Sequence, residues 1–281
     1  MELSYELRNG SSLRFIADRT CGHGGIVWDA AVVLAETVQR FAVASDPPLR
    51  VLELGAGCGL PGLVAAAGCG AHVILSDRPA LVPLLQANAD RAAADLRQGG
   101  SIQCVALNFG QRLQRLPATA RPPYDLILAS DILGCADEGA FEGILKTLAD
   151  VFAASVSSGG RLPTVLMAYR PRAPWESAFF VGARAKGWGV RLRETWAAAN
   201  VAGLKHRMLR SPASSCVVIA AGVAEATRSG GAASEVPCGA TPSTSAEVPG
   251  SESTPSDPES EWGGGAVEVW ELTAAAAEAP P

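Results

Sequence analysis

A glycine-rich loop is the strongest chemical signal in the chain. Residues 51–62 read VLELGAGCGLPG, with Gly55, Gly57 and Gly59 between a short apolar stretch and a segment that favours a helix. Glycine adopts turns that other residues avoid, and it lets the backbone lie close against a ligand. The start of the following helix would offer unpaired N–H groups to a polar ligand. The spacing therefore predicts a small-molecule site between a strand and a helix.

Two carboxylates near the loop narrow the choice of ligand. Asp77 follows the next apolar stretch, at the distance along the chain where an acid binds ribose hydroxyls. The dinucleotide pattern needs glycine where Leu60 stands, and an acid at Glu53 is unusual beside a pyrophosphate. S-adenosylmethionine has no phosphate but carries an ammonium, a sulfonium and a ribose, so it fits both acids. The alternative is a structural glycine turn of an ordinary doubly wound domain.

The elements that would position these residues alternate between strand and helix. Such alternation with apolar strands predicts an α/β fold, with a parallel sheet, helices on both of its faces and a ligand site beyond the carboxyl ends of the strands. Asn9-Gly10 additionally predicts an N-terminal β-hairpin between residues 3–8 and 12–17. Strands are expected at 51–54, 72–75, 101–107, 124–130, 162–169 and 190–195, and helices at 28–41, 59–67, 79–96, 137–156 and 174–186.

A seventh strand has two candidates. Residues 216–220 are apolar throughout, and residues 267–272 alternate well but follow a long polar stretch. We favour the first, which predicts a domain at 1–223 and an acidic low-complexity tail at 224–281. That tail holds ten acidic residues and one basic residue and too little apolar surface to fold, so we expect it to be disordered. In the alternative, residues 266–272 form an ordered strand of the domain.

Composition excludes several classes of function. No run of apolar residues is long enough to cross a bilayer, and the first residues do not resemble a signal peptide. No stripe of Lys and Arg predicts nucleic-acid binding. The seven cysteines include no CxxC pair and the three histidines are scattered, so neither a metal site nor a disulfide scaffold is expected. We expect a monomer in a reducing compartment, the cytoplasm or also the nucleus.

Three separated motifs carry a resemblance to a known family. Residues 25–35 (GIVWDAAVVLA), the glycine loop and residues 130–133 (SDIL) resemble the class I, seven-β-strand protein-lysine methyltransferases, the family-16 enzymes that modify non-histone proteins. The resemblance covers roughly residues 3–195. It implies a Rossmann-like seven-stranded sheet whose last strand is antiparallel. It also implies S-adenosylmethionine as methyl donor and a protein substrate such as a chaperone or translation factor.

The resemblance assigns roles to residues that bind the cofactor. The three glycines of the loop would wrap the methionine half of the cofactor, Glu53 would lie beneath it, and Asp77 would hold the ribose. Asn108 and Phe109, after the third strand, would face the adenine. Trp28, at the start of a helix, would cover the pocket. The residues are Trp28, Glu53, Gly55, Gly57, Gly59, Asp77, Asn108, Phe109 and Ser130.

The segment that would carry the catalytic residues departs from the family pattern at one position. Asp131 matches the acid that follows the fourth strand, whereas Gly134 stands where the family has Tyr or Phe. Tyr169 or Trp175 would then supply the missing wall. Arg170 would either position an acidic substrate segment or be a solvated arginine at the rim. We predict N-methylation of a protein, at lysine. The alternatives are a methyltransferase for a small molecule or another protein side chain, and an impaired module that only binds the cofactor or a partner.

Overall fold

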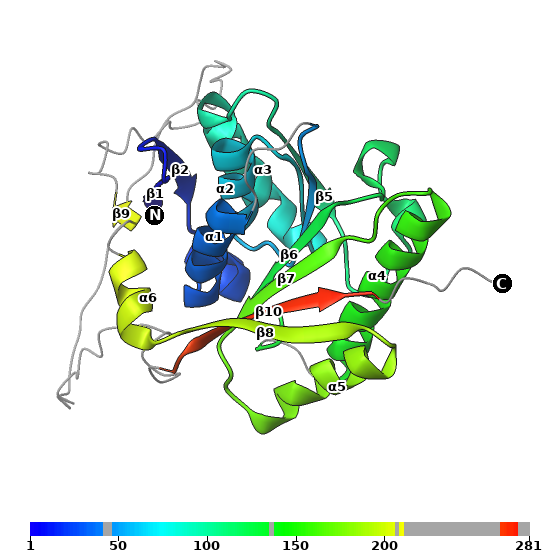
Figure 1. The fold of residues 1–281 in the computed structure, drawn as a ribbon. Helices are drawn as coiled ribbons and strands as arrows, with labels where there is room; N and C mark the ends of the chain where they lie inside the picture. Colours follow the sequence, from blue (N-terminus) through cyan, green and yellow to red (C-terminus); the bar gives the residue numbers. More distant parts are fainter. Residues whose placement is uncertain (42–46, 135–137, 206–207, 211–264, 275–281) are drawn as a thin grey trace, which may run out of the picture.

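A seven-stranded sheet forms the centre of the molecule. The computed structural model describes residues 1–41, 47–134, 138–205, 208–210 and 265–274 (Figure 1). The strand order is β5-β4-β3-β6-β7-β10-β8, parallel except for β10, which runs antiparallel to both of its neighbours. The predicted Rossmann-like sheet with an antiparallel last strand is confirmed. Its strands are β3 (Arg50–Leu54), β4 (His72–Asp77), β5 (Ser101–Ala106), β6 (Leu126–Ser130), β7 (Thr164–Tyr169), β8 (Gly189–Trp196) and β10 (Val267–Thr273).

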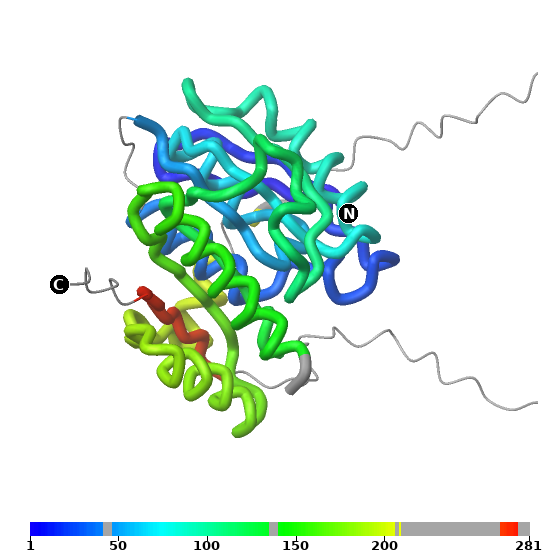
Figure 2. The backbone as a smooth tube through the Cα atoms, turned by 90° about the vertical axis from the view of Figure 1, so that its right-hand side faces the viewer, coloured from blue at the N-terminus to red at the C-terminus, as the bar shows by residue number. Residues whose placement is uncertain are grey.

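The preferred assignment of the seventh strand is corrected. The strand that completes the sheet is β10, which lies between β7 and β8 although it comes last in the chain (Figure 2, red). Val267, Val269 and Leu272 on it are fully buried. Residues 216–220, which we favoured, lie outside the described residues, as does the predicted boundary at residue 223. A strand from beyond that boundary therefore belongs to the domain.

Helices cover both faces of the sheet, as predicted. On one face lie α1 (Asp29–Phe41), α2 (Leu60–Cys69) and α3 (Val82–Ala92), and on the other lie α4 (Glu138–Ser157) and α5 (Ser177–Ala185) (Figure 1). Alternate residues of β6 and β7 point into two separate apolar cores, one beneath each layer of helices. Both faces of the central strands are therefore buried, which explains their continuous apolar sequences.

A second, smaller sheet covers the first layer of helices. The hairpin predicted around Asn9-Gly10 forms from β1 (Glu2–Glu6) and β2 (Ser12–Ile16), and β9 (Met208–Arg210) extends it. Asn88 of α3 ties the hairpin to the domain, because its side chain exchanges two hydrogen bonds with the backbone of Ile16. The short helix α6 (Ala198–Lys205) packs beside α1.

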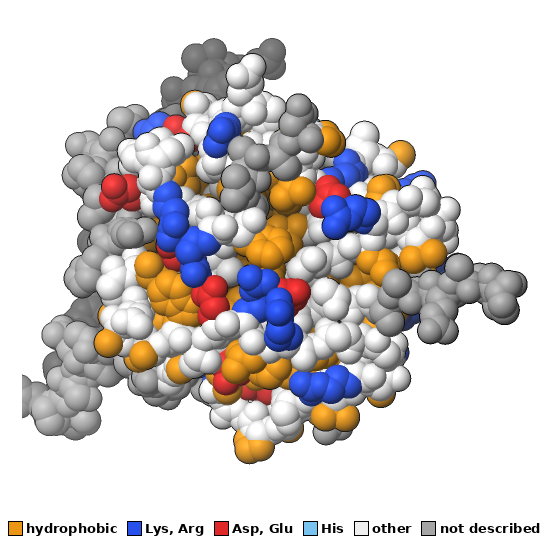
Figure 3. Space-filling model, in the orientation of Figure 1, with side chains coloured by type: hydrophobic (Ala, Val, Ile, Leu, Met, Phe, Trp, Pro, Cys, Tyr) orange, Lys and Arg blue, Asp and Glu red, His pale blue; other side chains and the backbone are white. Residues whose placement is uncertain are grey.

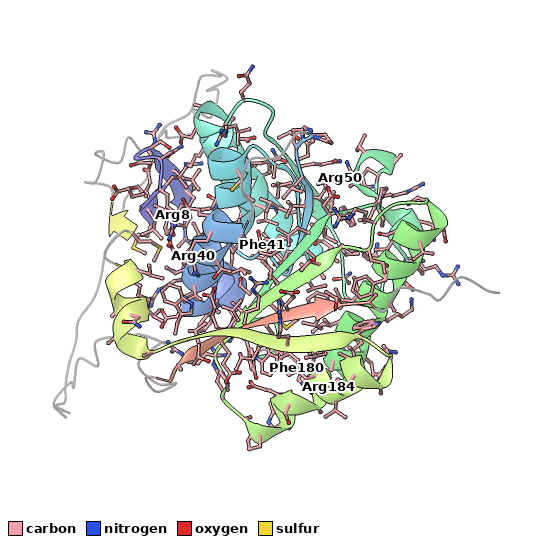
Figure 4. All side chains as sticks on the ribbon, in the orientation of Figure 1. Arg8, Arg40, Phe41, Arg50, Phe180 and Arg184 are labelled. Atoms are coloured by element: carbon pink, nitrogen blue, oxygen red, sulfur yellow. The ribbon has the colours of Figure 1, made fainter. Side chains whose placement is uncertain are left out.

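The surface mixes charges of both signs. On the face drawn in Figure 3, Lys and Arg side chains lie beside acidic and apolar ones. Arg40, labelled in Figure 4, pairs with Glu194, and Arg191 and Arg193 both pair with Glu271. Among the described residues, no helix is long and apolar enough to span a membrane.

Candidate active site

A cavity of about 390 Å³ opens at the carboxyl ends of β3, β4 and β6. This is the edge of a parallel sheet where ligands bind, and the volume is that of a small-molecule pocket. All predicted site residues except Glu53 and Tyr169 line it. They are Trp28, Gly55, Gly57, Gly59, Asp77, Asn108, Phe109, Ser130 and Asp131.

The glycine loop forms one wall of the cavity, and its conformation requires glycine. Gly55, Gly57 and Gly59 have φ angles of 61°, 55° and 81°, in the left-handed region that side chains disfavour. A Cβ on Gly55 would lie 2.7 Å from Cγ2 of Ile132, and one on Gly57 would lie 2.9 Å from the carbonyl oxygen of Gly24. At Gly55 and Gly57 the loop thus approaches its neighbours too closely for a side chain.

Asp77 is held at the rim of the cavity by the same loop. Its Oδ2 accepts a hydrogen bond from the Gly57 N–H at 2.8 Å, and its Oδ1 accepts one from the Arg78 N–H at 2.7 Å. A carboxylate has about four acceptor positions, so each oxygen keeps capacity for a further donor. A carboxylate fixed in this way can accept from the two hydroxyls of a ribose.

Glu53 lies under the loop rather than on the cavity wall. Its side chain is fully buried, its Oε2 accepts from the Gly62 N–H at 2.8 Å, and its Oε1 has no hydrogen-bond partner. Burial raises the pKa of Glu53 from 4.5 to about 8, against the lowering effect of the Gly62 N–H. The carboxyl is therefore mostly neutral at pH 7, and the negative charge that our sequence argument placed there is largely absent.

One residue that the sequence argument passed over, His23, lines the cavity beside the predicted Trp28. The indole Nε1–H of Trp28 donates to the carbonyl of His23 at 3.0 Å, and the two rings stack with centroids 6.0 Å apart. Both rings line the cavity. On the opposite side, Phe109 lies 3.4 Å from the position of a Gly55 Cβ, so its ring also borders the loop. Asn108 precedes it at an exposed position of the rim.

Asp131 is paired with Arg172, a residue that the sequence argument missed. The guanidinium donates from Nη1 to Oδ1 at 2.7 Å and from Nη2 to Oδ2 at 2.6 Å. The backbone at Asp131 is left-handed, with φ of 55°, and its N–H donates to the carbonyl of Ala168 at 2.8 Å. A non-glycine residue in this conformation is strained and is typical of functional sites.

The space of the missing aromatic is filled by the same arginine. A Cβ on Gly134 would lie 2.4 Å from Nη1 of Arg172, so the two side chains could not both occupy this place. The Arg172 guanidinium also lies over the Trp28 ring, with Cζ 5.6 Å from its centroid. Arg172 thus lies where a side chain at position 134 would lie, beside Asp131, but it does not line the cavity.

The other residues proposed for that end do not reach the cavity. Tyr169 is buried against Phe180 of α5, with ring centroids 5.7 Å apart, on the far side of the sheet from α1 (Figure 4 labels Phe180). Trp175 packs on Phe141. Arg170 is buried and bonded to Asp29 at the start of α1, so it does not face a substrate.

The residues present fit S-adenosylmethionine. The close backbone of the loop suits the methionine half, Asp77 retains acceptors for the ribose, and Phe109 offers a flat apolar surface at the far side. The apolar wall that Ile132 and Val27 add suits the flat faces of an adenine ring.

Comparison with known proteins agrees with this site. The family model described as lysine methyltransferase matches residues 7–185. The chain is 39% identical over 127 residues to protein N-lysine methyltransferase METTL21A of Danio rerio, covering 45% of this chain and 55% of the relative. It is 41% identical over 122 residues to histone-arginine methyltransferase METTL23 of Homo sapiens, covering 43% of this chain and 60% of the relative.

Solved structures add a weaker likeness. The crystal structure of Pyrococcus horikoshii TYW2 in complex with MeSAdo matches with 17% identity and a TM-score of 0.40, covering 69% of this chain and 64% of that one.

The matched part of this chain spans little more than half the length of METTL21A and METTL23. The family match covers more than half of this chain, and S-adenosylmethionine is the cofactor of the family. The chain therefore belongs to the family-16 lysine methyltransferases.

Proposed function

We propose that this protein is an S-adenosylmethionine-dependent N-methyltransferase that acts on a protein, at lysine. The observation that carries the proposal is the placement of Asp131 on the wall of the same cavity that the glycine loop and Asp77 form. A methyl donor and an acceptor must meet, and these residues bring the proposed nucleoside site and the carboxylate of Asp131 to one cavity. The lysine methyltransferase family and METTL21A support the lysine assignment.

The chemistry requires little from the protein beyond positioning. S-adenosylmethionine, when bound, would supply a methyl group on a sulfonium. A nitrogen lone pair forms a bond to the methyl carbon while the bond from that carbon to sulfur breaks, and S-adenosylhomocysteine leaves as a neutral thioether. At neutral pH only about one lysine amine in a thousand is neutral, which costs about 4 kcal/mol. We assign Asp131 to orient the acceptor nitrogen and to receive or relay its proton. Trp28 and His23 would exclude water from the reacting end.

A second acceptor class has one observation in its favour. Asp131 binds a guanidinium through two hydrogen bonds, the geometry in which a carboxylate recognises arginine. METTL23, at 41% identity, is named a histone-arginine methyltransferase. Arginine N-methylation is therefore the alternative to lysine N-methylation.

The proposed setting is the cytoplasm or the nucleus, with chaperones and translation factors as first candidate substrates and a monomeric enzyme. The four cysteines in the described part of the chain, Cys21, Cys58, Cys69 and Cys104, are free thiols, which supports a reducing compartment.

Incubation of the purified protein with isotopically labelled S-adenosylmethionine and cell extract tests the activity. We expect discrete labelled protein bands, with methyl-lysine at the mapped positions. Asp131→Asn should lower labelling at least tenfold while cofactor affinity stays within about twofold, because the residue serves the acceptor. Methyl-arginine would favour the second candidate. Label confined to small molecules, or cofactor binding without any transfer, would contradict protein methylation.

A further inference from the structure

We propose that Thr147, in the middle of α4, is a positioning residue for the cofactor. Its hydroxyl fixes the segment that carries Phe109, and it thereby sets the affinity for the adenosine part of S-adenosylmethionine. Thr147 does not line the cavity, so it acts through Phe109, which does. The inference rests on the proposed function, and within it on the assignment of Phe109 to the adenine ring.

The segment that carries Phe109 is attached to the domain on both sides of that residue. Residues 107–110 form no helix or strand, so their place depends on individual hydrogen bonds. On one side, the Leu107 N–H donates to the carbonyl of Asp77 at 2.8 Å. On the other side, the Gly110 N–H donates to Oγ1 of Thr147 at 2.8 Å. Of these two attachments, only the second uses a side chain, so a substitution can remove it.

Both hydrogen-bonding functions of the Thr147 hydroxyl are in use. The side chain is fully buried, and its Oγ1 donates to the carbonyl of Gly143 at 2.9 Å, one turn earlier in α4. A hydroxyl has one hydrogen, so this bond to the helix leaves the oxygen lone pairs for the N–H of Gly110. Removal of the hydroxyl would therefore leave that N–H without its partner, which is unfavourable in a partly buried place.

Two glycines let the segment lie directly on α4. Gly143 stands inside the helix, where glycine is unfavourable, and a Cβ there would lie 3.1 Å from Cβ of Phe109. Gly110 has a φ angle of 78°, so the chain turns in the left-handed region directly after Phe109. A Cβ on Gly110 would in turn lie 3.5 Å from Cα of Gly143. The backbone that carries Phe109 is thus fitted to this one turn of α4.

The ring of Phe109 extends from α4 to the glycine loop. It is partly buried against the apolar core beneath α4, and its Cζ lies 3.4 Å from the position of a Cβ on Gly55. A shift of the backbone at Phe109 therefore moves the ring relative to the cavity. Because contact between flat rings depends on their placement, such a shift weakens the binding of an adenine ring.

Calorimetry with two ligands tests the proposal on the full chain. The ligands are S-adenosylhomocysteine and methylthioadenosine, which share the adenosine part but differ in the amino-acid end. Thr147→Val keeps the shape of the side chain and removes its hydroxyl. We expect it to weaken the binding of both ligands by the same factor, about fivefold, which corresponds to one hydrogen bond.

The other variants separate positioning from a general effect on the helix. Ser155→Ala is the matched control, because Ser155 is also fully buried on α4 and its Oγ donates one turn back, to the carbonyl of Val151 at 3.0 Å. It forms no hydrogen bond with residues 107–110, so this variant should leave both affinities unchanged. Thr147→Ser keeps the hydroxyl and should retain the affinity of the unmodified protein. Gly143→Ala should weaken binding, because its Cβ displaces Phe109 although alanine favours the helix.

Unchanged affinity for both ligands in Thr147→Val would overturn the inference. An equal loss in Ser155→Ala would also overturn it, since the effect would then belong to the helix as a whole. A loss confined to S-adenosylhomocysteine would place the effect at the amino-acid end and contradict the role of Phe109. Should Thr147→Val not fold, Gly143→Ala decides, and unchanged affinity in that variant would refute the proposal.

The same measurements distinguish this inference from the proposed function. If the expected pattern of affinities is found but no methyl group is transferred to any protein, the inference stands and the proposed methyltransferase activity fails. If the unmodified protein binds neither ligand, the assignment of the cofactor site fails, and the inference fails with it.

Discussion

The buried carboxyl of Glu53 makes the stability of this protein depend on pH in a direction opposite to most carboxylates. Its pKa rises from 4.5 to about 8 because the side chain is fully buried. The one hydrogen bond that it accepts, from the Gly62 N–H, lowers the pKa and offsets only part of this rise. As the pH rises above about 4.5, the unfolded chain releases this proton while the folded protein retains it. The contribution of Glu53 to stability is therefore fully present below pH 4.5 and is lost as the pH rises toward 8.

The magnitude follows from the two pKa values. Between about pH 5 and about pH 7, the loss amounts to about 2.5 kcal/mol. Glu53→Gln removes the titrating group but keeps an oxygen that can accept from Gly62. The free energy of unfolding of the variant should therefore gain about 2.5 kcal/mol relative to the unmodified protein over that range, whatever the offset between the two at pH 5.

Urea denaturation at a series of pH values measures this difference directly. Because all other titrating groups are common to both proteins, their contributions cancel in the comparison. Parallel profiles for the unmodified protein and Glu53→Gln would refute the argument that Glu53 is protonated beneath the loop.

Three further predictions concern the cofactor residue Asp77, the strand β10 and the thiol of Cys58. Asp77→Ala should weaken S-adenosylmethionine binding by roughly ten- to a hundredfold in calorimetry, since acceptors for the ribose and for the Gly57 N–H are lost; unchanged affinity would remove Asp77 from the site. Truncation after residue 264 should prevent folding, because it removes three fully buried side chains of β10 that contribute about 5–9 kcal/mol to the free energy of unfolding. Truncation after residue 274 keeps β10 and should leave the circular dichroism spectrum and Tm unchanged. A folded protein without β10 would contradict the sheet order. Burial raises the pKa of Cys58 to about 12. At pH 8 the reactive thiolate is therefore rare, and iodoacetamide should alkylate Cys58 about a thousandfold more slowly in the folded protein than in the unfolded chain. Equal alkylation rates, measured by mass spectrometry, would contradict this prediction.

Local patterns in the sequence were sufficient for most of the fold. The hairpin, six strands of the sheet and the helices follow from turn residues and apolar periodicity, which act over a few residues. The choice of β10 over residues 216–220 does not, because both stretches have strand-like patterns. What distinguishes β10 is its pairing with β7 and β8, which precede it by a long stretch of chain.

Some residues of the candidate site could likewise be predicted from local sequence patterns, and others could not. The glycine loop and Asp77 were predicted because each lies at a fixed place after a strand of a parallel sheet, and Asp131 was predicted from the resemblance to the family. Arg172 was missed because its pair with Asp131 joins residues 41 positions apart and depends on the absence of a side chain at Gly134. The protonation of Glu53 could not be predicted either, since it depends on complete burial rather than on the residue type.

The crystal structure of the protein with S-adenosylmethionine tests the central claim most directly. We expect the cofactor in the cavity at the ends of β3, β4 and β6, with its ribose on Asp77 and its methyl group directed toward Asp131. An empty cavity at saturating cofactor, or a cofactor bound elsewhere on the protein, would contradict the account.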